Sequence, residues 1–168
     1  MAANRSLLWP TIGTMLFVVL FPGTVVVYVP YLLSRWTFGP AFFGVAITRW
    51  LGVALIVCGL PIFCDFLLRF VREGRGTPAP IAPPQHLVVG GAFRYVRNPG
   101  YVAVVSLLVG QALVFDSTAV LLYAFAVALA FHGFVVLYEE PTLRRQFGDE
   151  YEAYCRAVPR WLPRRRPR

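Results

Sequence analysis

The sequence predicts an all-α, polytopic membrane protein with four or five transmembrane helices and a C-terminal amphipathic helix. Of its 168 residues, 58% are hydrophobic, and the mean hydropathy is +0.63, a combination that ordinary soluble domains of this size rarely show. Several apolar runs approach or exceed the roughly 20 residues that a helix needs to cross a bilayer. Most charged residues lie between these runs or in the tail WLPRRRPR. These three observations favour a bundle of membrane helices.

The charge of the chain points to lipid. The net charge is +8, and all sixteen basic residues are arginines. Arginines beside apolar spans are typical of contact with anionic headgroups, at about 1 kcal/mol per charge near the surface, so nucleic acid is not the expected partner. The three cysteines, Cys58, Cys64 and Cys155, form no CxxC pair and have no histidine at metal-ligand spacing. We therefore expect structural cysteines and no metal.

Four apolar runs are candidate spans: residues 7–33, 45–70, 101–115 and 118–138. The first lacks a cleavage site, so we read it as a retained anchor rather than a signal peptide. Prolines predict kinks or ends in the first two runs, at Pro22, Pro30 and Pro61. The third run is short for a full crossing. Asp116 and Ser117 predict a tight turn and an N-cap, which would make the last two runs a helical hairpin.

The arginines also predict an orientation and a division of the chain. Five lie at the end of the second span or after it as far as residue 97, and eight follow the fourth. By the positive-inside rule, both termini and the loop RYVRNPGY then face the cytoplasm, as in a multi-pass protein of a bacterial inner membrane. Residues 1–73 would hold the N-terminal transmembrane helices. Residues 74–168 would hold a proline-rich connector, the hairpin and a C-terminal helix, within one structural domain.

The C-terminal helix is predicted by a stripe of apolar residues. In EEPTLRRQFGDEYEAYCRAVPRW, the side chains of Leu143, Phe147, Tyr151 and Tyr154 recur at helical spacing between charged positions. We expect an amphipathic helix that lies on the membrane surface or folds back over the connector.

Two glutamates end the fourth span. Glu139 and Glu140 are costly there unless they meet a cation, a donor or water, and His132, seven residues earlier, would share a helix face with Glu139. One reading makes the glutamates interfacial charges that pair with Arg144 or Arg145, with His132 as a hydrogen-bonded interior residue. The other makes them part of a functional site, because titratable groups inside membranes are often functional.

The segment RYVRNPGY interrupts the apolar pattern. Pro99 excludes helical geometry at Asn98, so the segment is either a helix start with arginines reaching the interface or an irregular stretch that holds a polar ligand. Asp65 and Arg69, four residues apart, predict an intrahelical ion pair. The glycines in EGRGTP lack the Gly-Lys-Ser/Thr of a nucleotide loop, and no G-x-S-x-G or H-E-x-x-H motif occurs.

Two motifs in order carry a resemblance to a known family. HLVVGGAFRYVRNPGY, then the hairpin, then EEPTLRRQFGDEYEAYCRAVP resembles the isoprenylcysteine carboxyl methyltransferase and phospholipid methyltransferase superfamily of integral membrane enzymes. The resemblance covers residues 74–163. It implies a membrane methyltransferase that uses S-adenosylmethionine as cofactor and a hydrophobic or lipid-like acceptor. Alternatives that stay open are a phosphatidylethanolamine-type N-methyltransferase and a non-catalytic membrane scaffold or small carrier.

The resemblance also implies the site residues. The cofactor-binding set is His86, Leu87, Gly91, Tyr95, Arg97, Asn98, Pro99, Tyr101, Glu139 and Glu140, and the catalytic pair is Glu140 and Arg144. The glutamates would meet the ammonium or sulfonium of the cofactor, Arg97 and Asn98 its carboxylate, and the tyrosines its adenine or cationic parts. Val135 stands where the eukaryotic prenylcysteine enzymes have an arginine, which argues against a prenylcysteine acceptor. The whole prediction requires that the two motifs meet in one pocket.

Overall fold

Apolar helices dominate the structure, a computed structural model that describes residues 20–40, 42–72 and 86–163. The main helices are α2 (Val29–Ser34), α3 (Ile47–Arg72), α4 (Pro99–Phe115), α5 (Thr118–Phe134) and α6 (Glu140–Ala157). Single turns of other helix types are η2 (Gly23–Tyr28), η3 (Phe42–Gly44), η4 (Gly91–Arg94) and η5 (Val135–Glu139). These described ranges contain no strand, which confirms the all-α class. The beginning of the first predicted span and the connector at 73–85 lie outside them.

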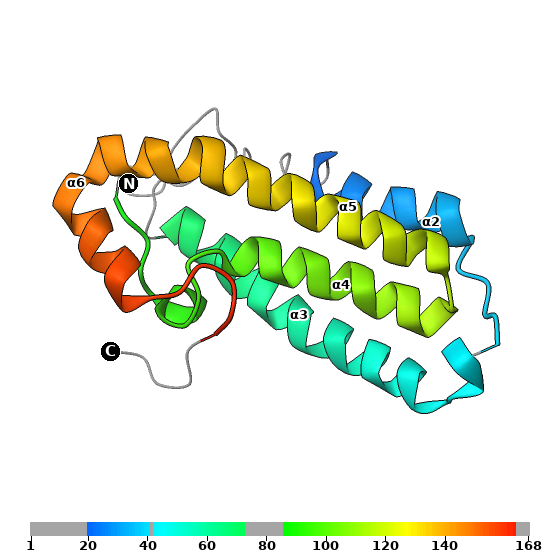
Figure 1. Ribbon diagram of the computed structural model, residues 1–168. Helices are drawn as coiled ribbons and strands as arrows, with labels where there is room; N and C mark the ends of the chain where they lie inside the picture. Colours follow the sequence, from blue (N-terminus) through cyan, green and yellow to red (C-terminus); the bar gives the residue numbers. More distant parts are fainter. Residues whose placement is uncertain (1–19, 41, 73–85, 164–168) are drawn as a thin grey trace, which may run out of the picture.

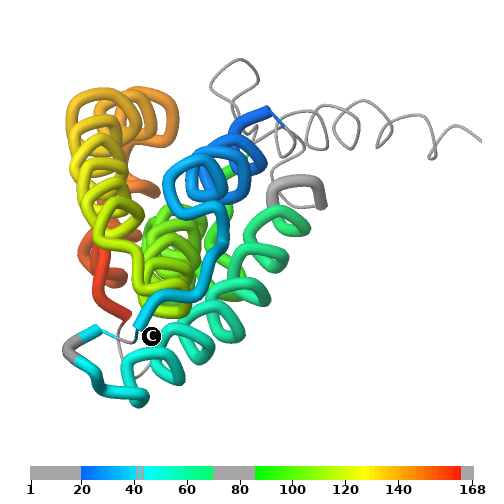
Figure 2. Tube along the Cα trace, turned by 90° about the vertical axis from the view of Figure 1, so that its right-hand side faces the viewer, coloured from blue at the N-terminus to red at the C-terminus, as the bar shows by residue number. Residues whose placement is uncertain are grey.

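Helix α4 is the centre of the bundle. It packs between α3 and α5, and α2 covers the side where α5 and α4 meet (Figures 1 and 2). A small buried core forms where these helices touch, around Val104, Leu108 and Ala124. Much of the outer surface is apolar: Trp50, Leu122 and other large side chains are more than half exposed. Exposed apolar faces of this extent are typical of helices that contact lipid or another protein.

Helices α3 and α4 touch through glycines. A Cβ atom added to Gly52 would lie 2.7 Å from the Gly110 carbonyl oxygen, and one added to Gly110 would lie 2.8 Å from the Gly52 carbonyl oxygen. Small residues at such contacts let helix backbones approach closely, as they commonly do in membrane bundles. The two glycines thus set the distance between α3 and α4.

The predicted hairpin between α4 and α5 is confirmed. Asp116 ends α4 in the left-handed conformation (φ 55°), and the Ser117 hydroxyl accepts a hydrogen bond from the Val120 amide at 3.3 Å. The expected interruption at Pro61 is wrong, because α3 continues through it. Membrane helices tolerate proline where neighbouring groups satisfy the freed carbonyl. Pro30 stands just after the point where η2 passes into α2, and the helix continues beyond it to Ser34, so Pro30 does not end it.

Two described helices are long and apolar enough to cross a membrane, Ile47–Arg69 and Thr118–Ala157. The apolar helices Gly23–Ser34 and Pro99–Phe115 are shorter, so four or five spans are not confirmed. The C-terminal helix α6 is present but differs from the single amphipathic helix that the sequence predicts. It bends at Gly148, whose backbone has φ 50° and ψ −124°. A residue with a Cβ rarely adopts these angles. The second half of α6 therefore turns back toward η4, as Figure 1 shows in orange and red.

Candidate functional site

The start of α4 builds one wall of the site. Asn98 has φ −122° and ψ 58°, outside the helical region, and α4 begins at Pro99, so the predicted helix start is confirmed. Asn98, Pro99 and Gly100 are all buried. A Cβ atom on Gly100 would lie 2.8 Å from the ring of Phe66, so glycine is what allows α4 to begin this close to α3. The loop is thus packed into the protein.

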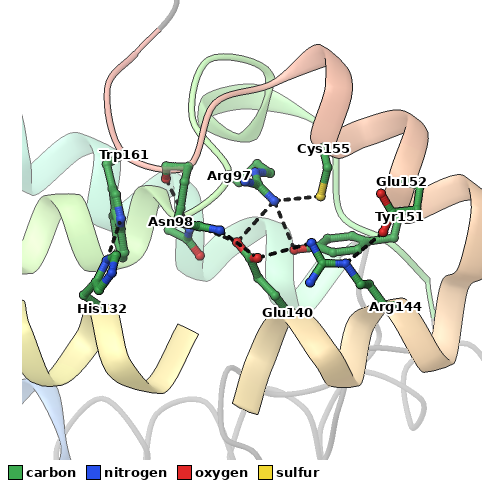
Figure 3. Close-up of polar contacts among 10 residues, drawn as sticks. Arg97, Asn98, His132, Glu140, Arg144, Tyr151, Glu152, Cys155 and Trp161 are labelled. Atoms are coloured by element: carbon green, nitrogen blue, oxygen red, sulfur yellow. Dashed lines mark hydrogen bonds and ion pairs between the residues drawn. The ribbon is translucent and has the colours of Figure 1, made fainter. Parts of the chain in front are cut away.

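Glu140 lies at the centre of a cluster of arginines. Its side chain is 3% exposed, and both oxygens are engaged: Arg160 donates from Nε to Oε1 at 2.6 Å and from Nη2 to Oε2 at 2.9 Å. Arg97 Nη1 lies 3.2 Å from Oε1, and Arg144 Nη2 lies 3.5 Å from Oε2 (Figure 3). The hydrogen bond to Glu140 raises the pKa of Arg160 above its usual value, so this cation stays charged.

Arg97 reaches from this cluster to the second half of α6. Its Nη1 donates to Cys155 Sγ at 2.6 Å and lies 3.5 Å from the Tyr151 hydroxyl. Its Nε is buried and has no hydrogen-bond partner among the described residues. A buried donor without a partner is costly, and such a group commonly marks an absent water or ligand.

Glu139 has different surroundings. The Tyr101 hydroxyl donates to its Oε2 at 2.8 Å, and the Tyr101 ring packs on Phe131 with 4.7 Å between the ring centroids. The adjacent glutamates therefore serve different groups: Glu140 meets arginines, and Glu139 meets a tyrosine.

Glu139 lines a cavity of about 480 Å³, within the range usual for small-molecule sites. The lining residues come from η2, α3, η4, the loop before α4, α4, α5 and η5, and from the residues just before η2. Most of them are apolar, including Phe63, Phe66 and Phe131, while Arg97, Asn98, Tyr101 and Glu139 supply the polar side chains. The cavity thus joins an apolar chamber to a polar end.

A short C-terminal strap, residues 158–161, packs against the loop before α4 and against Glu140. The Pro159 carbonyl accepts a hydrogen bond from the Arg97 amide at 2.9 Å, and the Arg160 carbonyl accepts one from Asn98 Nδ2 at 3.1 Å. The Trp161 indole donates to His132 Nδ1 at 3.1 Å (Figure 3). The Tyr154 hydroxyl, just before the strap, donates to the Phe93 carbonyl at 2.7 Å.

The structure brings the two sequence motifs together, as predicted, but not all the predicted residues. Arg97, Asn98, Pro99, Tyr101 and Glu139 line the cavity, and Glu140 and Arg144 lie in the arginine cluster.

The other predicted residues lie elsewhere. His86 and Tyr95 are exposed, and neither they nor Leu87 line the cavity. Gly91 (φ 51°) forms a turn against Asp65 and Arg69, whose predicted ion pair is confirmed at 3.0 Å.

The sequence pattern does not predict the contact of Arg160 with Glu140, and it predicts the wrong neighbour for His132. Arg160 makes the shortest contact to Glu140, but it follows the second motif directly and carries no helical periodicity. His132 does not share partners with Glu139, because the π-turn η5 between them changes the helical register and His132 meets Trp161.

The class that the fold and site define is an α-helical bundle with apolar helices long enough to cross a membrane and a mainly apolar cavity that has a polar end. The family comparison gives the particular assignment. A family described as Phospholipid methyltransferase matches residues 47–150, more than half of the chain, and the protein belongs to that family. No curated protein and no solved structure matches the chain significantly. The membership confirms the resemblance seen in the two motifs.

Proposed function

We propose that this protein is an integral membrane methyltransferase that moves a methyl group from S-adenosylmethionine to a hydrophobic or lipid-like acceptor. Its family supports the reaction class. The observation that carries the proposal is the cavity in which Arg97, Asn98, Tyr101 and Glu139, from the two halves of the sequence pattern, meet an apolar chamber. Such a chamber suits an apolar acceptor, and its polar end suits a charged donor.

The residues at the polar end fit S-adenosylmethionine. Arg97, whose buried Nε has no partner among the described residues, and Asn98 both line the cavity and are our candidates to hold the carboxylate. Glu139 offers a carboxylate to an ammonium or to a sulfonium. When bound, the cofactor supplies an electrophilic methyl group.

The side chains around the cavity would then orient the donor and the acceptor and enclose them. Tyr101 holds the Glu139 carboxylate through its hydroxyl, so that the acid has one fixed orientation toward the cavity. Phe131 supports the Tyr101 ring from α5. The apolar lining excludes water and strengthens every charge interaction at the polar end. Correct relative placement of donor and acceptor is a large contribution that such a site can make.

The acceptor side of the cavity is apolar. Phe21, Pro22 and Val25, before and within η2, line it together with Ala130 and Phe134 of α5. An acceptor with a long apolar part would enter here, between helices, from the bilayer. Val135, which stands where the eukaryotic prenylcysteine enzymes have an arginine, is fully buried and lies outside the lining, so this position offers no cation to an acceptor.

Two further candidates remain. N-methylation of a phosphatidylethanolamine-type lipid is favoured by the family description and by the Glu139 carboxylate, which could hold an amine. An amine must lose a proton before it attacks, whereas a carboxylate acceptor need not, so the pH profile of turnover separates the two. A scaffold or carrier would bind no methyl donor.

The topology that accompanies our proposal has the polar site and both termini in the cytoplasm.

Cofactor binding tests the proposal. Purified protein in detergent is heated with and without S-adenosylhomocysteine. At 100 times its dissociation constant this ligand should stabilise the folded state by about 2.7 kcal/mol. A labelled-methyl assay on total membrane lipids then identifies the acceptor. Absence of any stabilisation over a wide concentration range would contradict the proposal and favour the scaffold.

A further inference from the structure

Residues 158–161, the C-terminal strap, touch three separate parts of the site. The strap contacts the loop before α4 through two carbonyls, the first turn of α6 through the Arg160 side chain, and α5 through Trp161. We infer that Arg160 is a positioning residue: it holds Glu140 and Asn98 in place, and thereby keeps Arg97 available to the methyl donor. This inference rests on the proposed function.

The first argument is the division of contacts on Glu140. Arg160 makes a two-point contact with both carboxylate oxygens, at 2.6 and 2.9 Å, a geometry that fixes orientation as well as distance. Arg97 reaches one oxygen with a single nitrogen at 3.2 Å. Because Arg160 satisfies Glu140, Arg97 is not drawn into a two-point pair, and its Nε stays without a partner in the described structure.

The second argument is the backbone. The Arg97 amide donates to Pro159, and the Asn98 side chain donates to the Arg160 carbonyl, so two residues that line the cavity are held by two neighbouring residues of the strap. Asn98 is 8% exposed, so its amide group has little water to replace this partner. The strap therefore fixes the loop from outside the cavity.

The third argument is the anchor at the end of the strap. The Trp161 indole donates to His132 on α5, and the centroids of the two rings are 5.9 Å apart. Helix α5, which leads through η5 to Glu139 and Glu140, thus also holds the strap. None of the strap lies in the residues 47–150 that match the family, so family membership does not assign it.

The experiment compares Arg160→Ala, Arg160→Lys and the matched control Arg156→Ala in full-length protein. Arg156 is an exposed arginine in the last turn of α6 and lies outside the cluster. Affinity for S-adenosylhomocysteine is measured by calorimetry, and stability by thermal unfolding without ligand. We expect Arg160→Ala to weaken binding about tenfold, Arg160→Lys to weaken it about threefold because an ammonium lacks the fork of a guanidinium, and Arg156→Ala to change nothing.

A purely structural role predicts a different result. Both Arg160 variants would then unfold at lower temperature but would bind with the affinity of the wild type once folded, and that outcome overturns the inference. If Arg160→Ala does not fold, Arg160→Lys decides alone, since it keeps the charge. Wild-type protein that binds no S-adenosylhomocysteine contradicts the proposed function itself, whereas binding that is equal in all four proteins contradicts only the role of Arg160.

Discussion

The Tyr101 hydroxyl donates a hydrogen bond to the Glu139 carboxylate at 2.8 Å, across 38 residues of sequence. This contact joins the first turn of α4 to the last residue of η5 and lies at the wall of the cavity. The neighbouring Glu140 is turned to other partners, three arginines. The two adjacent acids therefore have different surroundings: Glu139 lines the cavity, and Glu140 lies among the arginines.

Tyr101→Phe should weaken binding of S-adenosylhomocysteine while the protein stays folded. The change keeps the ring that packs on Phe131 but removes the hydrogen bond that the Glu139 carboxylate accepts from the Tyr101 hydroxyl. One hydrogen bond to a charged group contributes about 1.5–3 kcal/mol, so we expect a loss of about tenfold or more in affinity. Tyr138→Phe, at a half-exposed tyrosine of η5, is the control. Equal affinities in the two variants would remove Tyr101 from the site.

Substitution of the two glutamates should separate binding from stability. Glu139→Gln should reduce ligand affinity at least tenfold with a small change in unfolding temperature, because the side chain faces the cavity. Glu140→Gln should lower stability by about 1–3 kcal/mol, since it leaves the nearly buried Arg97 guanidinium without its charged partner, and should also reduce affinity through Arg97. Thermal unfolding and calorimetry on both variants check this. A Glu140→Gln protein as stable as the wild type would contradict the predicted role of Glu140 in stability.

The local features of the fold follow from local sequence. A proline that sets a helix start, a serine that caps the next helix and an i,i+4 ion pair all depend on neighbouring residues, and Pro99, Ser117 and the Asp65–Arg69 pair are where the pattern predicts them. The convergence of the two motifs could also be predicted, because they flank a hairpin that returns the chain to the same end of the bundle.

The partners of Glu140 could not be predicted in this way. Helical spacing favours Arg144 or Arg145; Arg144 is indeed near, but Arg145 bonds Thr142 instead. The dominant partner, Arg160, comes from a strap that arrives only because α6 bends at Gly148. From sequence, one glycine in an amphipathic pattern indicates only an unfavourable position in a helix and does not predict a turn. The path of the chain after it depends on tertiary contacts.

Gly110→Ala should destabilise the protein by about 1–3 kcal/mol. The new methyl group would lie 2.8 Å from the Gly52 carbonyl oxygen and 2.7 Å from Ile56, so α3 and α4 would have to move apart. Gly133→Ala is the matched control: it is also a helical glycine in an apolar helix, with nothing within 4 Å of the added atom, and should be neutral or slightly stabilising. Thermal unfolding in detergent measures both. Equal effects would mean that the close helix contact is not needed.

Gly148→Ala should loosen the second half of α6 from the site. Its φ of 50° and ψ of −124° are strained for any residue with a Cβ, at about 1–3 kcal/mol, although no atom would clash with the added methyl group. The cost should shift the chain toward a straighter helix, which would carry Tyr154 away from the Phe93 carbonyl and weaken the strap. We expect a lower unfolding temperature and reduced affinity for S-adenosylhomocysteine. Tyr154→Phe, which removes one hydrogen bond but keeps the bend, should cost only about 1 kcal/mol. If Gly148→Ala binds and unfolds as the wild type does, the bend does not hold the strap in place.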